Sequence, residues 1–353
     1  MTQDWLLVET LGDQPMVVAQ GRQMKNFIPI AVFLRRNPNL PAIQTAIVET
    51  VGTGSGLASI TPKTKRVIRT EPVRMSDARI HAVHVWCGPV DAEPPERPIP
   101  GPFKWDVTLG EGSATLEYFI NAGMDPATES STGRAFAEDI PSRSFNRDEA
   151  KALSWTIDAA PDRTFCATWD FPDKQGTFRR VGWCARTLME PVDDGTEHLI
   201  ARALNLVEHV TDSPLPPNAF ADRILHGLAQ PGVHRAVADI NNWTLLKWID
   251  DPCPYFNWRD ARMHPTDLEH LAAQMSEELG HGGTQAVFRL PGNGDEEWVP
   301  MHVTINRIEL EGGVYGGLVT LRLPTDDELS AAGLERPGHV SDGPDADPDP
   351  DPD

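Results

Sequence analysis

Aromatic residues crowd one short stretch of the sequence and could line a binding pocket. They are Trp243, Trp248, Tyr255, Phe256 and Trp258. Ligand pockets are concave and lined mostly by apolar and aromatic side chains, so these five residues form a candidate pocket for a flat or apolar ligand. The same rings could instead fill the core of a small domain. The sequence leaves both interpretations open.

Cysteine is the second residue type with available chemistry. Cys87, Cys166, Cys184 and Cys253 include no C-x-x-C pair and form no disulfide framework. Cys166 and Cys184 lie on two segments that we expect to pair as a hairpin, which makes a redox pair conceivable. Cys253 lies among the aromatic residues and suggests a flavin or haem group, but the C-x-x-C-H motif of haem attachment is absent. The cofactor is therefore left unknown.

The histidine and carboxylate residues show no spacing typical of a catalytic or metal site. His81 and His84 lie on one predicted strand, where an odd separation places them on opposite faces. His264 and His270 are six residues apart, which is not the helical i, i+4 spacing of a zinc pair. The glycine-rich segment 52–56 follows a predicted helix and lacks the Gly-Lys-Ser of a phosphate loop. We predict no catalytic and no metal-binding residues.

The charge of the chain argues against two classes of partner. The 353 residues carry a net charge of −21, of which the segment from Pro324 to Asp353 supplies −9. A chain this acidic has no basic footprint for nucleic acid or for anionic lipid. No apolar run approaches the length of a membrane span, and the first residues do not resemble a signal peptide. We expect a soluble, cytoplasmic protein.

Proline-rich segments divide the chain into modules. Pro89–Pro102 holds six prolines in fourteen residues, and further breaks fall at Glu190–Gly195 and Asp212–Asn218. These breaks predict modules over 1–98, 99–195 and 196–324. The third would begin with a helical connector, because Leu199–Val210 has apolar residues at helical spacing. An acidic Asp-Pro tail over 325–353 cannot bury a core and is expected to stay disordered.

Within the modules one order of elements recurs: strands, an amphipathic helix, and then longer strands. The helices are predicted over Asn39–Val51, Arg147–Ala160 and Thr266–Leu279, and the third opens with the capping-box spacing of Thr266 and Glu269. This pattern predicts an α+β fold of three tandem modules, each an antiparallel sheet with helices on one face. The predicted strands are Trp5–Leu11, Pro15–Gln20, Arg66–Arg74, Arg79–Cys87, Phe103–Leu109, Thr164–Phe171, Thr177–Leu188, Thr284–Leu290, Glu297–Glu309 and Val314–Leu323.

Two resemblances follow from particular motifs. His264-Pro265-Thr266-Asp267-Leu268 resembles the helix-opening His-Pro-x-Asp-Leu of many PAS domains. The whole chain before the tail is similar to a conserved actinobacterial (mycobacterial-type) family of sensor-domain-only proteins, through Asp4–Leu11, Glu93–Pro102 and Gly133–Asp139. The resemblance implies PAS-like and GAF-like modules without an effector domain. It brings no known ligand and no catalytic residue.

These observations favour a non-catalytic sensor or scaffold in signal transduction. Such a protein would bind a small molecule, an unidentified protein partner of a signalling pathway, or both. The alternative is an enzyme whose site is assembled between modules from scattered His and Asp residues. A purely structural hub that holds a partner without any ligand is a third reading.

Overall fold

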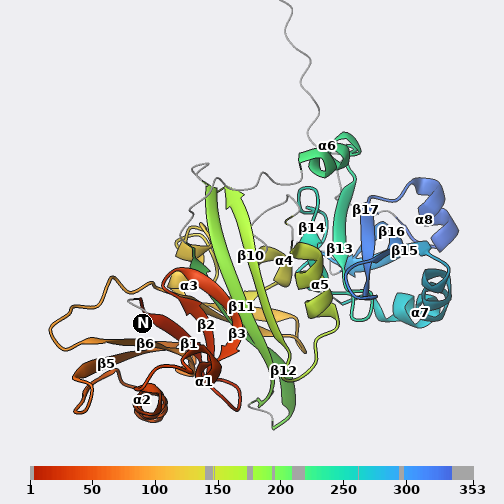
Figure 1. Cartoon of the computed structure of the whole chain (residues 1–353). Coiled ribbons are helices and arrows are strands. Elements are labelled where there is room, and N and C mark those ends of the chain that lie inside the picture. Colours follow the sequence, from red (N-terminus) through yellow and green to blue (C-terminus); the bar gives the residue numbers. More distant parts are fainter. Residues whose placement is uncertain are drawn as a thin grey trace, which may run out of the picture. The chain divides into compact units, whose positions relative to one another are not determined.

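The computed structural model describes residues 4–139, 146, 148–172, 178–192, 195–208, 219–260, 262–293 and 298–335. The chain forms two compact units (Figure 1). One comprises Met1–Gly227 with Glu309–Tyr315, and the other comprises Leu228–Ile308 with Gly316–Asp353. The acidic tail predicted to be disordered over 325–353 is described only over 325–335, where Asp326–Ala332 forms a helix instead, and its remainder lies outside the described residues.

The first sheet is antiparallel and has the strand order β3-β2-β1-β6-β5-β4. Helices α1 (Ile30–Phe33) and α2 (Leu40–Thr53) cover one of its faces with Ile30, Ile43 and Ile47. Helix α2 confirms the helix predicted over Asn39–Val51, and Gly54 ends it in the left-handed conformation that glycine adopts at little cost. The strands are β1 (Leu6–Glu9), β2 (Met16–Gln20), β3 (Gln23–Pro29), β4 (Leu57–Thr61), β5 (Arg66–Arg74) and β6 (Ile80–Pro89).

The second sheet has the order β10-β11-β12-β7-β8-β9 and carries three short helices. Helix α5 (Glu149–Ile157) is the core of the helix predicted over Arg147–Ala160. Helices α3 (Leu116–Asn121) and α4 (Phe136–Asp139) were not expected. The strands are β7 (Gly101–Asp106), β8 (Glu111–Ala114), β9 (Thr132–Arg134), β10 (Thr164–Pro172), β11 (Phe178–Pro191) and β12 (Glu197–Val207).

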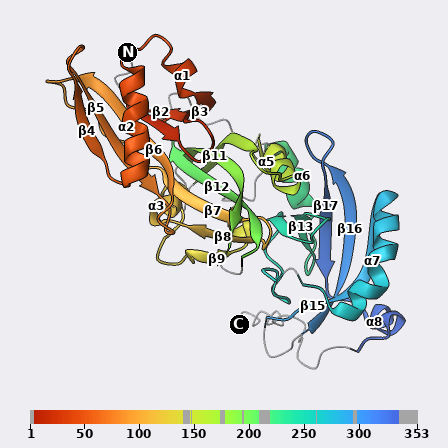
Figure 2. The ribbon, with the colours of Figure 1, turned by 90° about the horizontal axis from the view of Figure 1, so that it is seen from below.

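The third sheet, in the other unit, has the order β14-β13-β17-β16-β15, of which β13, β17, β16 and β15 are labelled in Figure 2. Helix α7 (Pro265–Gly280) packs on β15, and α8 (Asp326–Ala332) follows the last strand. Helix α6 (Ala219–Gly227) precedes the first strand. The strands are β13 (His234–Ala238), β14 (Leu245–Trp248), β15 (Gly283–Pro291), β16 (Trp298–Glu309) and β17 (Tyr315–Arg322).

All three sheets share one topological feature. In each, the first strand lies inside the sheet and pairs with the last strand, as β1 with β6, β7 with β12, and β13 with β17. Every one of these pairings is antiparallel. The predicted α+β architecture of three antiparallel modules is therefore confirmed.

The connector helix predicted over Leu199–Val210 is wrong. Glu197–Val207 forms strand β12, which pairs with β11 on one side and with β7 on the other. Consecutive residues from Ile200 to Leu206 are buried, because both faces of the strand are covered. A strand buried on both faces loses the alternation of apolar and polar residues, so its sequence can imitate a helical stripe.

The two faces of the second sheet have different neighbours. One face carries the aromatic core described below, and the other packs on the first sheet through apolar residues that include Leu7, Val18 and Leu204. Ion pairs of two buried arginines join the same two modules. Arg186 binds Glu9 at 2.8 Å and Arg202 binds Asp77 at 2.7 Å, while Arg202 also binds Glu190 of its own sheet at 2.6 Å. The first two modules therefore form one packed unit.

Candidate functional site

The second module contains a partly open aromatic cavity of about 70 Å³ between its sheet and its three helices. Strands β7, β10, β11 and β12 provide the floor, while α3, α4 and α5 provide the walls. Period-two alternation places Phe165 and Trp169 of β10 and Trp183 of β11 on this face. The aromatic lining consists of Phe103, Trp105, Tyr118, Phe136, Trp155, Phe165, Trp169 and Trp183.

The rings of this cavity hold one another in place. Trp183 is central, because its ring lies 5.4 Å from that of Trp169, 5.6 Å from that of Tyr118 and 5.9 Å from that of Phe103. Most of these contacts are edge-to-face or tilted, which are the favoured arrangements of aromatic pairs. The walls are thus a preformed aromatic surface.

Polar atoms in these aromatic walls lack partners. The indole nitrogens of Trp155, Trp169 and Trp183 are buried without a hydrogen-bond partner among the described residues. A buried polar group left unpaired costs free energy, so native structures satisfy most such groups with protein, water or ligand. These nitrogens are themselves covered by protein, and the surface that faces the cavity is almost wholly apolar, so the cavity suits an apolar or aromatic molecule.

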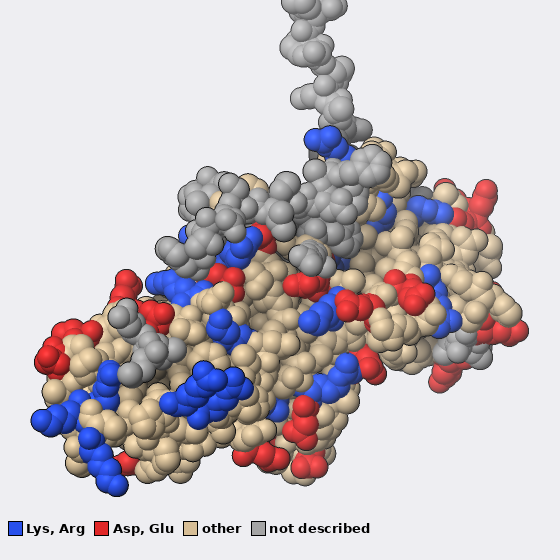
Figure 3. Space-filling view, viewed as in Figure 1, with Lys and Arg blue, Asp and Glu red and all other residues tan. Residues whose placement is uncertain are grey.

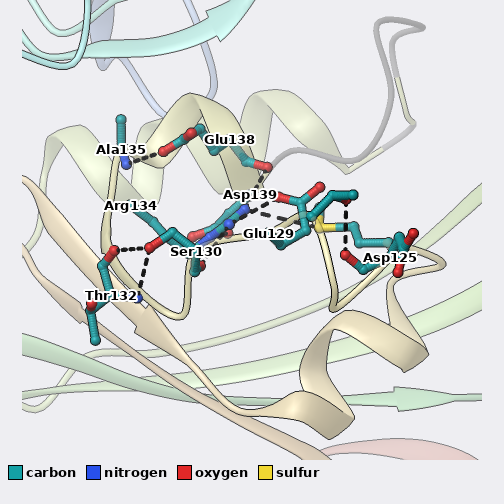
Figure 4. A network of polar contacts seen from close by, with 10 residues as sticks. Asp125, Glu129, Ser130, Thr132, Arg134, Ala135, Glu138 and Asp139 are labelled. Carbon is teal, nitrogen blue, oxygen red and sulfur yellow. Dashed lines mark hydrogen bonds and ion pairs between the residues drawn. The ribbon is translucent and has the colours of Figure 1, made fainter.

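The lining residue Asp139 belongs to a buried network of polar contacts centred on Arg134 (Figure 4). Arg134, only 1% exposed, donates from Nε to Asp139 at 2.7 Å and from Nη1 to Glu129 at 3.1 Å. It also donates to the backbone carbonyls of Ser130 at 3.0 Å and Glu138 at 3.1 Å. These contacts fix the segment that brings the lining residues Phe136 and Asp139 to the cavity.

Burial controls the protonation of the two acids in this wall. It raises the pKa of Asp139 to about 6, even though the charge of Arg134 acts in the opposite direction. Burial, together with the nearby Asp139 carboxyl, raises the pKa of the Tyr118 phenol well above its ordinary value. The Tyr118 hydroxyl also interacts with the Asp139 carboxyl, which opposes the effect of burial on the pKa of Asp139.

The sequence-predicted pocket residues lie in the third module, where the structure brings only some of them together. Trp243, Phe256 and Trp258 line a second cavity, of about 90 Å³. Trp248 is buried outside that lining, with its ring 5.9 Å from the ring of Trp258. Tyr255 packs edge-on against His234 at 6.2 Å. Three of the five candidates thus share a cavity.

The cysteines and histidines take mostly buried positions. Cys166 and Cys184 face each other across β10 and β11, as the predicted hairpin requires, and both are free thiols. Burial raises the pKa of Cys166 to about 12 and that of Cys253 to about 11. His81 accepts a hydrogen bond from Arg202 at 3.0 Å, and burial lowers its pKa to about 4. In the part of the chain that the structure describes, no group of residues is placed to hold a metal ion.

Family models match almost the whole folded part of the chain. They are the N-terminal, middle and C-terminal domains described as Rv3651-like, over residues 4–96, 99–208 and 218–332. The chain belongs to the Rv3651-like family. A crystal structure of an uncharacterised member from Mycobacterium tuberculosis is 52% identical, covers 95% of this chain and 100% of its own, and has a TM-score of 0.84.

Beyond this Rv3651-like relative the likeness to solved structures is slight. A sensory box histidine kinase/response regulator from Burkholderia thailandensis is 15% identical over 36% of this chain and 86% of its own, with a TM-score of 0.22. An RNA-binding light-oxygen-voltage receptor is 12% identical over 66% of this chain and 99% of its own, with a TM-score of 0.24. Scores this low carry no inference. No curated protein matches the sequence.

Sequence reasoning missed the aromatic cavity of the Rv3651-like middle domain. Its rings are spread from Phe103 to Trp183, so no short window shows them together. A signal was present: Phe165, Ala167 and Trp169 alternate along one predicted strand, and Val181, Trp183 and Ala185 alternate along its partner. When these two strands are paired, Phe165 and Trp169 of one strand and Trp183 of the other lie on the same face of the sheet.

Proposed function

We propose that this protein is a non-catalytic sensor whose middle module binds a small molecule in the aromatic cavity. The observation that supports this most directly is a cavity of about 70 Å³ in one module whose lining is almost wholly apolar and includes eight aromatic side chains. A catalytic role has less support there. The ionisable groups of the lining are Asp139, held by Arg134, and the Tyr118 and Cys184 groups, whose pKa values burial raises.

The proposal includes a signalling role. Strands β11 and β12 line the cavity on one face and carry Arg186 and Arg202 on the other, where both residues bind the first module. A ligand that shifts these strands would therefore act directly on the packing between two modules. The sensor would relay this change to a protein partner. The PAS-like and GAF-like nature of the modules is part of the same proposal.

Ligand retention by the purified protein tests the proposal. Native mass spectrometry of the full chain, before and after denaturing extraction, should reveal a bound small molecule or its uptake from a metabolite extract. Trp183→Ala removes the central ring of the cavity and should abolish uptake, whereas Trp248→Ala in the other unit should not. Equal uptake by both variants would contradict the placement of the site in the middle module. Turnover of the bound molecule would contradict a non-catalytic role.

A further inference from the structure

We propose that the middle-module cavity selects a compact aliphatic group of about three carbon atoms and excludes both aromatic rings and polar groups of similar size. This inference rests on the proposed function and adds the chemical class of the ligand. Three properties of the cavity define the class: the chemistry of its surface, its volume and the packing of its walls.

The oxygen-bearing side chains of the lining are already engaged. The Thr156 hydroxyl donates to the Ala152 carbonyl at 3.0 Å. The Asp139 carboxyl accepts from Arg134 at 2.7 Å, and the Tyr118 hydroxyl interacts with the same carboxyl. A polar ligand would lose its hydrogen bonds to water and gain few in return, because the surface that faces it is almost wholly apolar. An aliphatic ligand has no such cost.

The volume of the cavity excludes an aromatic ring. The cavity measures about 70 Å³. An engineered apolar cavity that binds benzene measures about 150 Å³. At the same density of packing, half of that volume holds about three carbon atoms instead of the six of a benzene ring.

The packing of the walls resists the expansion that a larger ligand would require. The ring of Trp183 packs against those of Trp169 and Tyr118, with ring centres 5.4 Å and 5.6 Å apart. On the other side of the lining, Trp155 packs against Phe165 with ring centres 5.5 Å apart. Extra volume forced into a close-packed interior displaces side chains and costs free energy. A benzene ring would have to separate rings that now stabilise one another.

The aliphatic group can come from two sources, because the cavity is partly open. It can be a free hydrocarbon, or it can be the end of a longer molecule whose polar part stays at the opening. Both sources place the same chemistry inside the cavity, and the length of the probe distinguishes them.

Four probes separate polarity, size and length. Propane is the reference, ethanol is its polar counterpart with the same number of non-hydrogen atoms, benzene is the larger ring, and pentan-1-ol carries a propyl end and a distant hydroxyl. The readout is the set of ring ¹H–¹³C signals of the full-length protein, assigned with Trp155→Phe, Trp169→Phe and Trp183→Phe. Trp5→Phe assigns the matched control, a buried indole of the first module that lies outside this cavity.

The expected result is a saturable shift of at least two of the three cavity indoles with propane, while the Trp5 signals do not move. The apparent dissociation constants of ethanol and benzene should be at least about tenfold weaker. Pentan-1-ol should bind more tightly than propane if the group is the end of a longer molecule, and more weakly if it is a free hydrocarbon.

Two results would overturn the inference in different ways. Binding of ethanol or benzene as tight as that of propane would overturn the ligand class and leave the proposed cavity site standing. No saturable shift of the cavity indoles with any of the four probes would overturn the cavity site as well.

Discussion

At the scale of single residues, Arg134 shows how a buried charge is kept in this fold. Its guanidinium has partners on several sides, and its face also lies 4.9 Å from the ring centre of Phe119. A buried ion pair adds little compared with an apolar pair of the same shape, but removal of one member leaves the other charged and unpaired. The stability of the cavity wall therefore depends on both Arg134 and Asp139 being present.

Arg134→Met should destabilise the protein by about 3–5 kcal/mol at pH 8. The loss in free energy of unfolding should be smaller at pH 5.5. The folded-state pKa of Asp139, about 6, lies above the ordinary value, so this group's contribution to stability falls as pH rises toward that pKa. Loss of the Arg134 cation raises the pKa further, and a protonated Asp139 no longer needs a cation. Urea unfolding of variant and parent at both pH values measures this.

Arg163→Met is the matched control for that experiment, because Arg163 forms an ion pair with Asp158 whose members are 41% and 64% exposed. Exposed pairs contribute at most about 1 kcal/mol, with little dependence on pH in this range. If Arg134→Met lowers the free energy of unfolding equally at pH 5.5 and at pH 8, the loss of stability is not due to an unpaired Asp139 carboxylate.

At the scale of elements, the sequence predicts the long periodic segments well and their ends less well. The capping-box spacing stands at the start of two helices, at Thr266–Glu269 in α7 and at Thr325–Glu328 in α8. The structure uses only the second, at the start of α8. The predicted box at Thr266 is wrong because Pro265 occupies the first turn of α7, and His264 caps that helix by accepting from the Thr266 N–H at 3.3 Å.

The contrast between local sequence patterns and long-range strand order explains which parts of the candidate site could be predicted. Local periodicity places an aromatic residue on a face of its own strand. It does not show that Trp155, Trp169 and Trp183, which lie on α5, β10 and β11, meet around one space. That meeting depends on the strand order β10-β11-β12-β7, in which β12 brings distant segments together. Short windows therefore favoured the dense cluster at Trp243–Trp258.

Thr325→Ala should loosen α8 at a cost of about 1 kcal/mol. The Thr325 hydroxyl accepts from the Glu328 N–H, and the Glu328 carboxylate accepts in return from the Thr325 N–H at 2.8 Å. Hydrogen exchange of the Asp326–Ala332 amides should accelerate about fivefold, as that free energy implies. Thr266→Ala serves as the comparison and should leave exchange in α7 nearly unchanged. Equal acceleration in both helices would contradict the capping assignment.

Strand β12 supplies a second prediction at this scale. Arg202→Ala leaves Glu190 and Asp77 without their buried partner and should cost about 3–5 kcal/mol. Burial would raise the pKa of Asp77, but Arg202 lowers it overall, so this stabilisation is present at neutral pH and is lost as the solution is acidified. Arg79→Ala, which removes a 41% exposed partner of the same Glu190, should cost about 1 kcal/mol or less. Similar losses in urea unfolding would contradict the structural role of Arg202.

At the scale of the whole molecule, the negative charge of the chain is shared unequally among the modules. Residues 4–96 contain ten Lys and Arg against nine Asp and Glu, so the first module is nearly neutral in an otherwise acidic chain. Basic side chains gather over this module in Figure 3. The turn between β4 and β5 carries the exposed Lys63 and Lys65. The expectation that no nucleic acid or anionic lipid binds rests on the net charge, so it applies less to this module than to the others. No helix among the described residues is long and apolar enough to span a membrane.

The division into two compact units predicts two thermal transitions in calorimetry of the full chain. The first two modules share a buried apolar cluster that includes Leu204 and Leu206, so they should unfold together. Leu204→Ala should lower one transition by several degrees, because such a deletion typically costs about 2–5 kcal/mol. Met275→Ala, which removes a buried side chain of α7, should lower the other transition alone. Three thermal transitions in the parent protein would contradict unfolding as two units. A shift of both transitions by either variant would contradict it as well.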